Sequence, residues 1–227
     1  MPQSLLQALF PSACACCGDI LVQGERQVCL ECLADLAYTR YGSHDDNPAE
    51  RLLAGCTHLV HATAMLHFRQ GGTVQKLVHA MKFDGCSDLC VEMGRQLGME
   101  LLRAGRFDAV DVLVPVPLHW TRRLARGYNQ SELLCRGIAQ TFGRSLNTSA
   151  LKRHRRTAKQ SQQARSERGR NVEDAFRVRR PEQLEGKHIL LVDDVVTTGA
   201  TLASCCHALA SVPGIRISIA TLAIAGG

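Results

Sequence analysis

From about residue 58 onward the chain alternates between two hydrophobic patterns. Short apolar runs predict strands, and apolar residues at helical spacing predict helices. The predicted strands are residues 57–68, 109–117, 188–194 and 215–225. The predicted helices are residues 73–83, 88–105, 129–143 and 199–211. This alternation predicts an α/β fold, with a mostly parallel sheet covered by helices on both faces.

The residues before this alternating region follow a different pattern. Five of the 11 cysteines fall between positions 14 and 32, which marks a small module at residues 1–40. The polar stretch that follows contains Gly and Pro, so residues 41–57 are predicted to be a linker. His44 and Asp45 in this stretch are interpreted as part of a solvated loop rather than as metal ligands. Residues 58–227 are then the predicted main domain.

The cysteine-rich module contains two C-x-x-C pairs, Cys14 with Cys17 and Cys29 with Cys32. Each pair brackets a tight turn that could place two thiolates on one ion, and four thiolates complete the tetrahedral coordination of zinc. The intervening residues predict a short hairpin that turns at Gln23–Gly24. Two pairs at this spacing predict a structural zinc site.

Other interpretations of the cysteines remain open. They could be buried thiols without a metal, or one pair could be redox-active, although a redox site needs only one pair. Cys16 is either a bystander or a substitute ligand. The six remaining cysteines lack ligand spacing and are predicted to act as small apolar residues.

The composition favours a soluble globular protein, with 45% hydrophobic residues and a mean hydropathy of -0.06. No segment is long and apolar enough to span a bilayer, and the first apolar run lacks the basic residues of a secretory signal. We therefore predict a cytoplasmic protein. The net charge of +6 attracts polyanions without identifying one. An aromatic content of 4% argues weakly against a surface on which bases stack.

The stretch LLVDDVVTTGATL, residues 190–202, places two acids at the end of an apolar strand and just before a helix. Ligands of parallel sheets bind beyond the carboxyl ends of the strands, and a helix N-terminus binds phosphate. Gly199 lets the backbone approach a ligand closely. Further hydroxyl donors are Thr197, Thr198 and Thr201. A ribose 5-phosphate would satisfy both features, with its diol on Asp193 and Asp194 and its phosphate on the loop.

Two other phosphate-binding motifs do not fit this stretch. A P-loop requires a lysine that the turn lacks, and the G-x-G-x-x-G dinucleotide motif is absent. Acids that merely cap the following helix remain an alternative.

The segment VDDVVTTGAT resembles the phosphoribosyl-pyrophosphate (PRPP) motif of type I phosphoribosyltransferases. This resemblance implies that Asp193 and Asp194 hold the ribose hydroxyls. It implies that the 5-phosphate is held by Val196, Thr197, Thr198, Gly199, Ala200 and Thr201.

Three features together extend the resemblance over nearly the whole chain. They are VPVPLHWTRRLARGYNQSELL, QSQQARSERGRNVEDAF and the double C-x-x-C module. With these, the chain resembles the ComF-type, competence-associated phosphoribosyltransferase-like proteins. The resemblance implies a type I phosphoribosyltransferase-like sheet, a Mg²⁺–PRPP ligand, and a cytoplasmic role in the uptake of single-stranded DNA during transformation.

The pyrophosphate of PRPP would require cations. Arg122, Arg123 and Arg126 follow the predicted strand 109–117, and arginine can donate two hydrogen bonds to phosphate oxygens. The alternative is a basic solvated turn before a helix that Asn129 caps. Lys82, in the segment MKFDG, is a further candidate through the resemblance, and its alternative is a surface lysine.

A second basic run extends from Leu151 to Asn171 and contains eight cations and one acid. The resemblance places it where type I enzymes carry a mobile loop that closes over the reacting centre. It could instead contact nucleic-acid phosphates, or be a solvated charge run. The candidate residues are Arg155, Arg156, Lys159, Arg165 and Arg168.

The implied reaction is substitution at the anomeric carbon of PRPP, with Mg²⁺ neutralising the departing pyrophosphate. Purine-salvage enzymes often carry an acid at the position of Thr197, so salvage of a purine base is disfavoured. No signature identifies an acceptor or a general base. Two hypotheses follow: a transferase with an unidentified acceptor, or a PRPP-regulated module that binds single-stranded DNA with little or no turnover. A third is an adaptor whose zinc module docks another protein, such as one of the competence machinery.

Overall fold

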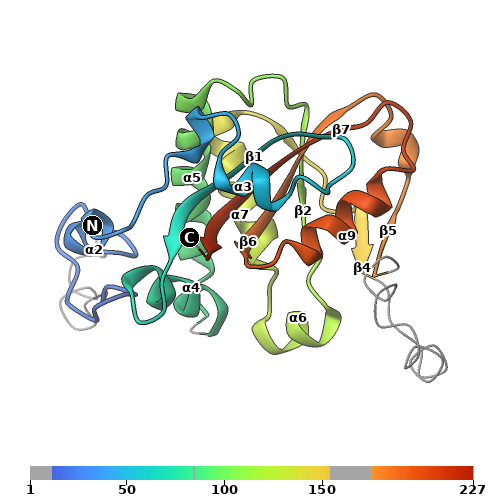
Figure 1. Ribbon diagram of the computed structural model, residues 1–227. Helices are drawn as coiled ribbons and strands as arrows, with labels where there is room; N and C mark the ends of the chain where they lie inside the picture. The colour runs from blue at the N-terminus through green and yellow to red at the C-terminus, as the bar shows by residue number, and fades with distance from the viewer. Residues whose placement is uncertain (1–11, 84, 154–174, 227) are drawn as a thin grey trace, which may run out of the picture.

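The computed structural model describes residues 12–83, 85–153 and 175–226. At its centre lies a five-stranded sheet in the order β1-β7-β6-β2-β3, in which every neighbouring pair is parallel (Figure 1). The strands are β1 (Leu59–Phe68), β2 (Val112–Pro115), β3 (Ser145–Leu146), β6 (His188–Val196) and β7 (Arg216–Ala225). The predicted fold class, a mostly parallel sheet with helices on both faces, is confirmed.

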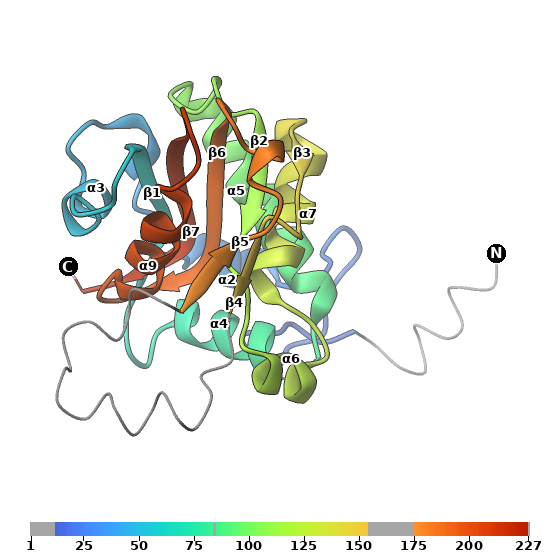
Figure 2. The ribbon, with the colours of Figure 1, turned by 90° about the vertical axis from the view of Figure 1, so that its right-hand side faces the viewer.

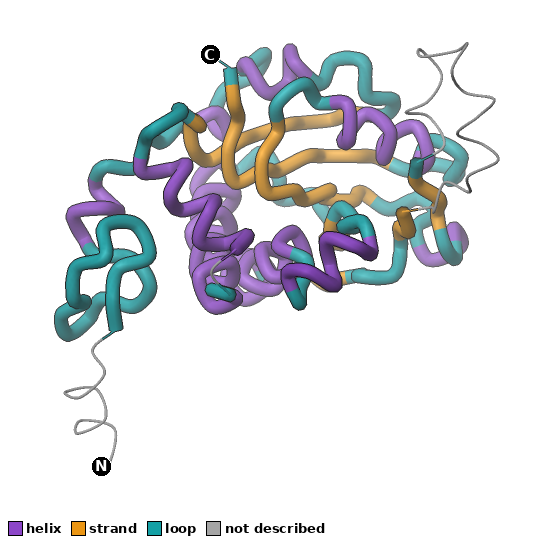
Figure 3. Tube along the Cα trace, turned by 90° about the horizontal axis from the view of Figure 1, so that it is seen from below, coloured by secondary structure: helices purple, strands orange, loops and turns teal. Residues whose placement is uncertain are grey.

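Helices cover both faces of the sheet because alternate strand residues face opposite ways (Figure 3). Leu190 and Val192 of β6 join the buried cluster formed with α5 and α7, whereas Ile189 and Leu191 join the cluster formed with α9. The helices of the first face are α4 (Thr73–Phe83), α5 (Ser87–Ala104) and α7 (Gln130–Phe142). Those of the second face are α3 (Pro48–Leu52) and α9 (Ala200–Leu209).

Glycines allow α5 and α7 to pack with their backbones in close contact. A Cβ atom added to Gly94 of α5 would lie 2.2 Å from the carbonyl oxygen of Leu134, and one added to Gly137 of α7 would lie 2.1 Å from that of Val91. No side chain fits at such distances. This packing holds the N-terminus of α7 near the carboxyl end of β6, where the acids lie.

The predicted strands and helices of the main region are all present, with ends that differ by a few residues. The strand predicted over 188–194 continues to Val196, because Val195 and Val196 still pair with β7. Outside residues 41–57, the prediction missed five short α-helices and strands of the described chain. These are α2 (Leu30–Ala34), α6 (Trp120–Arg126), β3, β4 (Leu151–Arg153) and β5 (Phe176–Val178). β4 and β5 form a separate antiparallel pair. Elements of two to seven residues are too short to show a hydrophobic period.

The stretch predicted as a polar linker, residues 41–57, is folded against the sheet. It forms the 3-10 helix η1 (Tyr41–Ser43) and then α3, whose N-cap is Asn47. The Asn47 amide also donates to the Ala62 carbonyl at 3.0 Å, and Glu50 accepts from the Ala62 amide at 3.3 Å. β1 is an edge strand, so its outer backbone groups need such partners. The division of the chain into separate domains at residues 1–40 and 58–227 stays a prediction.

The described part of the N-terminal module, from residue 12, has little regular structure besides α2. The expected turn at Gln23–Gly24 is present, with the Glu25 amide donating to the Val22 carbonyl at 3.0 Å. The expected hairpin strands do not form within residues 19–28: the bridge at Ile20 pairs it with Ala13, which precedes the expected hairpin. Over the described residues, no helix combines the length and apolar character needed to cross a bilayer.

Candidate functional site

The two adjacent acids near the end of β6 have different partners. Asp193 accepts hydrogen bonds from the Ser131 hydroxyl and from the Asp194 amide, both at 2.9 Å. The Asp194 carboxylate lies 2.9 Å from the ammonium nitrogen of Lys82. Ser131 lies in the first turn of α7 and Lys82 in the last turn of α4. Three elements therefore meet at this acid pair.

The surroundings of Asp193 change the ionisation of its carboxyl group. Burial raises the pKa of Asp193 to about 7, and the charge of Asp194 adds to this effect. The amide of Asp194, the hydroxyl of Ser131 and the charge of Lys82 oppose it. Near neutral pH the carboxyl group of Asp193 is therefore close to its midpoint. A ligand that donates hydrogen bonds to it would favour the ionised form.

Lys82 is held in place through the carbonyl group of the preceding residue. The Met81 carbonyl accepts hydrogen bonds from the Tyr128 hydroxyl at 2.9 Å and from the Gln130 side-chain amide at 3.2 Å. Gln130 in turn accepts a bond from the Arg126 guanidinium at 3.1 Å. One buried glutamine thus connects α4, α6 and α7 around the acids.

A cleft of about 190 Å³ opens above the acid pair. Its cationic lining consists of Lys82, Arg122, Arg126 and Arg153. Arg122 and Arg126 are four residues apart on α6 and so share one side of the helix, whereas Arg123 lies elsewhere on α6 and does not line the cleft. Three of the four predicted pyrophosphate ligands are therefore gathered here, and Arg123 is separated from them. Their binding role stays a prediction.

The predicted phosphate loop surrounds the N-terminus of α9. A hollow of about 40 Å³ is lined by Asp193 and by residues 195–202, and it shares Asp193, Val195 and Thr201 with the larger cleft. Gly199 is the N-cap of α9 and has a φ of 76°, a left-handed conformation that favours glycine. The free amides at the start of α9 make this hollow suitable for a phosphate group.

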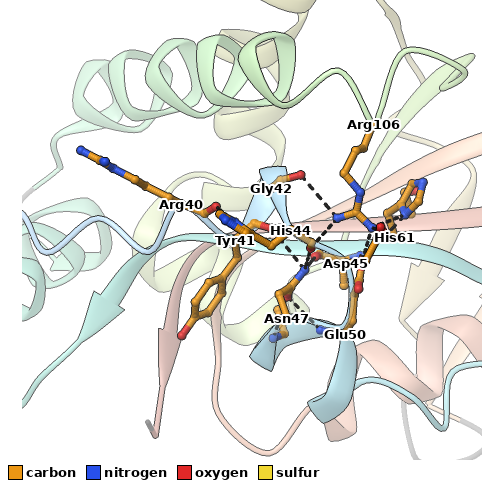
Figure 4. A network of polar contacts seen from close by, with 12 residues as sticks. Arg40, Tyr41, Gly42, His44, Asp45, Asn47, Glu50, His61 and Arg106 are labelled. Carbon is orange, nitrogen blue, oxygen red and sulfur yellow. Dashed lines mark hydrogen bonds and ion pairs between the residues drawn. The ribbon is translucent and has the colours of Figure 1, made fainter.

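The folded segment before β1 supports this loop from behind. A Cβ atom at Gly199 would lie 3.0 Å from Leu53 Cδ2, so the loop rests on the end of α3. α3 is fixed in turn by the largely buried pair of Glu50 and Arg106, which are 3.0 Å apart (Figure 4). The Arg106 guanidinium also contacts His61 at 2.9 Å. The remaining partners of Arg106 are the carbonyl groups of Gly42 and His44 and the carboxylate of Asp45.

Sequence reasoning missed three residues of the site. Ser131 and Gln130 follow Asn129, which was recognised only as a helix cap. The available signal for Ser131 and Gln130 was their position, because both are polar residues at the start of a helix that follows a buried strand. Arg153 belongs to the second basic run but was not selected, and its guanidinium lies 5.4 Å from the centre of the Phe176 ring. The predicted loop cations Arg155, Arg156, Lys159, Arg165 and Arg168 lie outside the described residues.

The predicted cysteine cluster is assembled in the N-terminal module. The sulfur atoms of Cys14, Cys17, Cys29 and Cys32 all lie within 4.8 Å of one another. Backbone amides donate to two of these sulfurs, for example from Cys29 to Cys14 at 3.3 Å. Burial raises the pKa of Cys14, but such amides outweigh it and lower the value to about 6. Four close thiols with amide donors fit zinc, and Cys16 is not part of the group.

Comparison with known proteins identifies a domain in the C-terminal half of the chain. Residues 130–226 match the family described as Phosphoribosyl transferase domain. This segment contains Ser131, the acid pair and the predicted phosphate loop. A solved structure titled "Structure of the allosteric regulatory enzyme of purine biosynthesis" is similar at 21% identity and a TM-score of 0.39, covering 57% of this chain and 25% of that one. This weak likeness adds nothing to the fold assignment.

Several relatives carry names that refer to DNA utilization or to competence. The chain is 40% identical to "DNA utilization protein YhgH" of Salmonella typhi over 130 residues, which are 56% of each chain. It is 31% identical to "Competence protein F" of Haemophilus influenzae over 44% of each chain, and 35% identical to "Competence protein ComFC" of Bacillus subtilis over 40% of this chain and 35% of that one. The chain thus spans about half the length of the curated relatives it matches. The resemblance to ComF-type phosphoribosyltransferase-like proteins is confirmed.

Proposed function

We propose that this protein, whose residues 130–226 form a phosphoribosyl transferase domain, binds Mg²⁺–PRPP in the cleft at the end of β6. The observation that supports the proposal is the order of charges along the cleft. The acid pair lies between the N-terminus of α9 on one side and Lys82, Arg122 and Arg126 on the other. PRPP has the same order of groups, with a ribose diol between a 5-phosphate and a pyrophosphate.

Each group of PRPP then has a defined partner. Asp193 and Asp194 accept hydrogen bonds from the ribose hydroxyls. The 5-phosphate takes the free amides and hydroxyls of residues 196–201. Lys82, Arg122 and Arg126 hold the pyrophosphate, and Arg153 is a further cation in the lining of the cleft. Mg²⁺ bound with the substrate would supply further neutralisation of the pyrophosphate charge.

The proposed reaction is substitution at the anomeric carbon. The bond from this carbon to the pyrophosphate oxygen breaks, and pyrophosphate leaves with the electron pair. Positive charge develops on the ribose ring, where the carboxylates of Asp193 and Asp194 stabilise it. The new bond forms to an acceptor whose proton is lost to solvent or to a base outside the acid pair.

We place this activity in the handling of DNA, because the relatives are named DNA utilization protein and competence protein. A second candidate function is the binding of single-stranded DNA under the control of PRPP, without turnover. It is supported by a basic surface on α6, beside the cleft, together with the exposed aromatic side chains of Trp120 on α6 and Phe83 at the end of α4. The cysteine cluster, in this proposal, binds zinc as a structural centre.

Calorimetric titration of Mg²⁺–PRPP tests the ligand assignment. We expect wild-type protein to bind, and the double variant Asp193→Asn/Asp194→Asn to bind more than about 100-fold more weakly, because hydrogen bonds to charged groups contribute ~1.5–3 kcal/mol each. Asp108→Asn, which changes an exposed acid before β2, is the control and should bind like wild type. Unchanged affinity in the folded double variant would exclude the acids as the ribose site. Pyrophosphate release with added acceptors then separates transfer from binding alone.

A further inference from the structure

Helix α6 has an unusual surface for a helix of a folded domain. It lies next to α4, beyond the edge of the sheet at which the strands end (Figure 1), and it projects away from the sheet in the perpendicular view (Figure 2). None of its residues is buried. Trp120 is 48% exposed and Leu124, one helical turn later, is 80% exposed. Apolar side chains gathered on an exposed surface mark a site of interaction.

The exposed side chains of α6 continue onto the end of α4. Phe83 is 63% exposed, and the Arg126 guanidinium lies 5.3 Å from the centre of its ring. Phe83 and Trp120 are the most exposed Phe, Tyr or Trp side chains in the described part of the chain. The aromatic content of 4% argued only weakly against a surface on which bases stack. The fold places these two aromatic residues on the same side of the molecule, beside the cleft.

The charge of this surface defines the chemistry of its partner. Residues 116–131 include three arginines and no acid. Arg122 and Arg126 line the cleft, whereas Arg123 is exposed outside it. A partner must therefore be anionic and must also offer apolar faces to the aromatic rings. Single-stranded nucleic acid has both properties, since its phosphates are charged and its bases are unpaired. A duplex hides the faces of its bases.

We propose that α6 and Phe83 form a binding platform for single-stranded nucleic acid. Bases stack on Trp120 and Phe83, and phosphates contact Arg123. The strand then passes the mouth of the cleft, because Arg122 and Arg126 on the same helix line it. The inference builds on the second candidate function and does not depend on the binding of PRPP.

The only tryptophan of the chain lies on this surface, which provides a direct probe. Zinc-loaded full-length protein is titrated with oligothymidine while tryptophan fluorescence is recorded. We expect saturable quenching by the single strand, weaker binding at high salt, and little quenching by the duplex with oligoadenine. Equal binding of single strand and duplex would overturn the proposal. An absence of oligonucleotide binding at low salt would also overturn the proposal. This conclusion would hold even if an acidic peptide bound to the protein.

Variants locate the surface through the anisotropy of a labelled oligothymidine. Trp120→Ala should weaken binding by about 5- to 150-fold, the range measured for the loss of one stacked base. Arg123→Ala should weaken it and reduce its salt dependence, whereas Arg103→Ala, at an exposed arginine of α5, should not. Wild-type affinity in both Trp120→Ala and Arg123→Ala would overturn the platform.

Calorimetry with Mg²⁺–PRPP on the same samples keeps the two proposals apart. Trp120 and Arg123 do not line the cleft, so their variants should bind PRPP like wild type. This result also shows that the variants are folded. Wild-type protein that binds oligothymidine but not PRPP would refute the PRPP site and leave the platform standing.

Discussion

Replacement of Gly199 by alanine tests whether the phosphate loop needs its observed shape. Gly199 has a φ of 76°, and the left-handed conformation costs an L residue about 1–2 kcal/mol. The new methyl group would also lie 3.0 Å from Leu53 Cδ2 and 3.6 Å from the Leu52 carbonyl oxygen. Leu53 is buried, so its side chain cannot move away freely. We therefore expect a second cost, about 1 kcal/mol at the low end of the range for overpacked sites.

A matched control separates these two effects. Gly105, at the end of α5, has a φ of 67° and no atom within 4 Å of an added Cβ. Gly105→Ala should therefore lower the free energy of unfolding by the conformational cost alone, and Gly199→Ala by more. Urea denaturation of both variants measures the difference.

The same pair of variants reports on the candidate ligand site. If the loop relaxes to avoid the strain, its amides leave their positions at the N-terminus of α9. A loss of 1.4 kcal/mol of binding free energy then corresponds to a tenfold rise in the Kd for Mg²⁺–PRPP, which calorimetry measures. Gly105→Ala should bind PRPP like wild type. If Gly199→Ala is as stable as Gly105→Ala and binds PRPP with wild-type affinity, the argument from the glycine conformation is refuted.

Three further predictions concern the metal cluster, the acid pair and the segment before β1. Cys14→Ala should lose bound zinc and Cys16→Ala should retain it in a colorimetric assay of released metal, because only Cys14 belongs to the cluster of four sulfurs; zinc loss from both would make Cys16 a ligand. With the pKa of Asp193 raised to about 7, the folded protein holds a proton that an unfolded chain releases near pH 4, so the free energy of unfolding should fall between about pH 4 and 7. Asp193→Asn should remove this decrease in urea titrations, and an unchanged profile would place the proton elsewhere. Arg106→Gln should cost about 3–5 kcal/mol of stability because it leaves a buried carboxylate unpaired. Arg51→Gln, in an exposed ion pair, should cost only about 0–1 kcal/mol, and similar losses in both would contradict the importance of burial.

The local pattern of the sequence was sufficient for much of the fold. The longer helices could be predicted because burial on one face imposes a period that a short window reveals, and the longer strands because burial on both faces leaves short apolar runs. The acid pair and the predicted phosphate loop could be proposed for a related reason, since all their residues lie within one strand–loop–helix unit. The cysteine cluster was found from two close pairs whose spacing suits a shared ion.

The partners of the acids could not be predicted in the same way. Ser131 lies 62 positions before Asp193, and Lys82 lies still further from Asp194. No local period records such contacts, because they depend on the packing of α4 and α7 beside β6. The separation of Arg123 from Arg122 and Arg126 could not be predicted either, because it depends on α6, a helix too short to be recognised from the sequence.

The segment at residues 41–57 shows the difference most clearly. By itself the sequence determined that this stretch is polar, and polar stretches with Gly and Pro are usually exposed. The tertiary structure decided that its polar groups serve the edge of β1 and that Leu53 supports Gly199. Composition describes how a segment interacts with water. Only the fold supplies an unpaired strand edge and a close backbone, and these draw Asn47, Glu50 and Leu53 inward while most of the segment stays exposed.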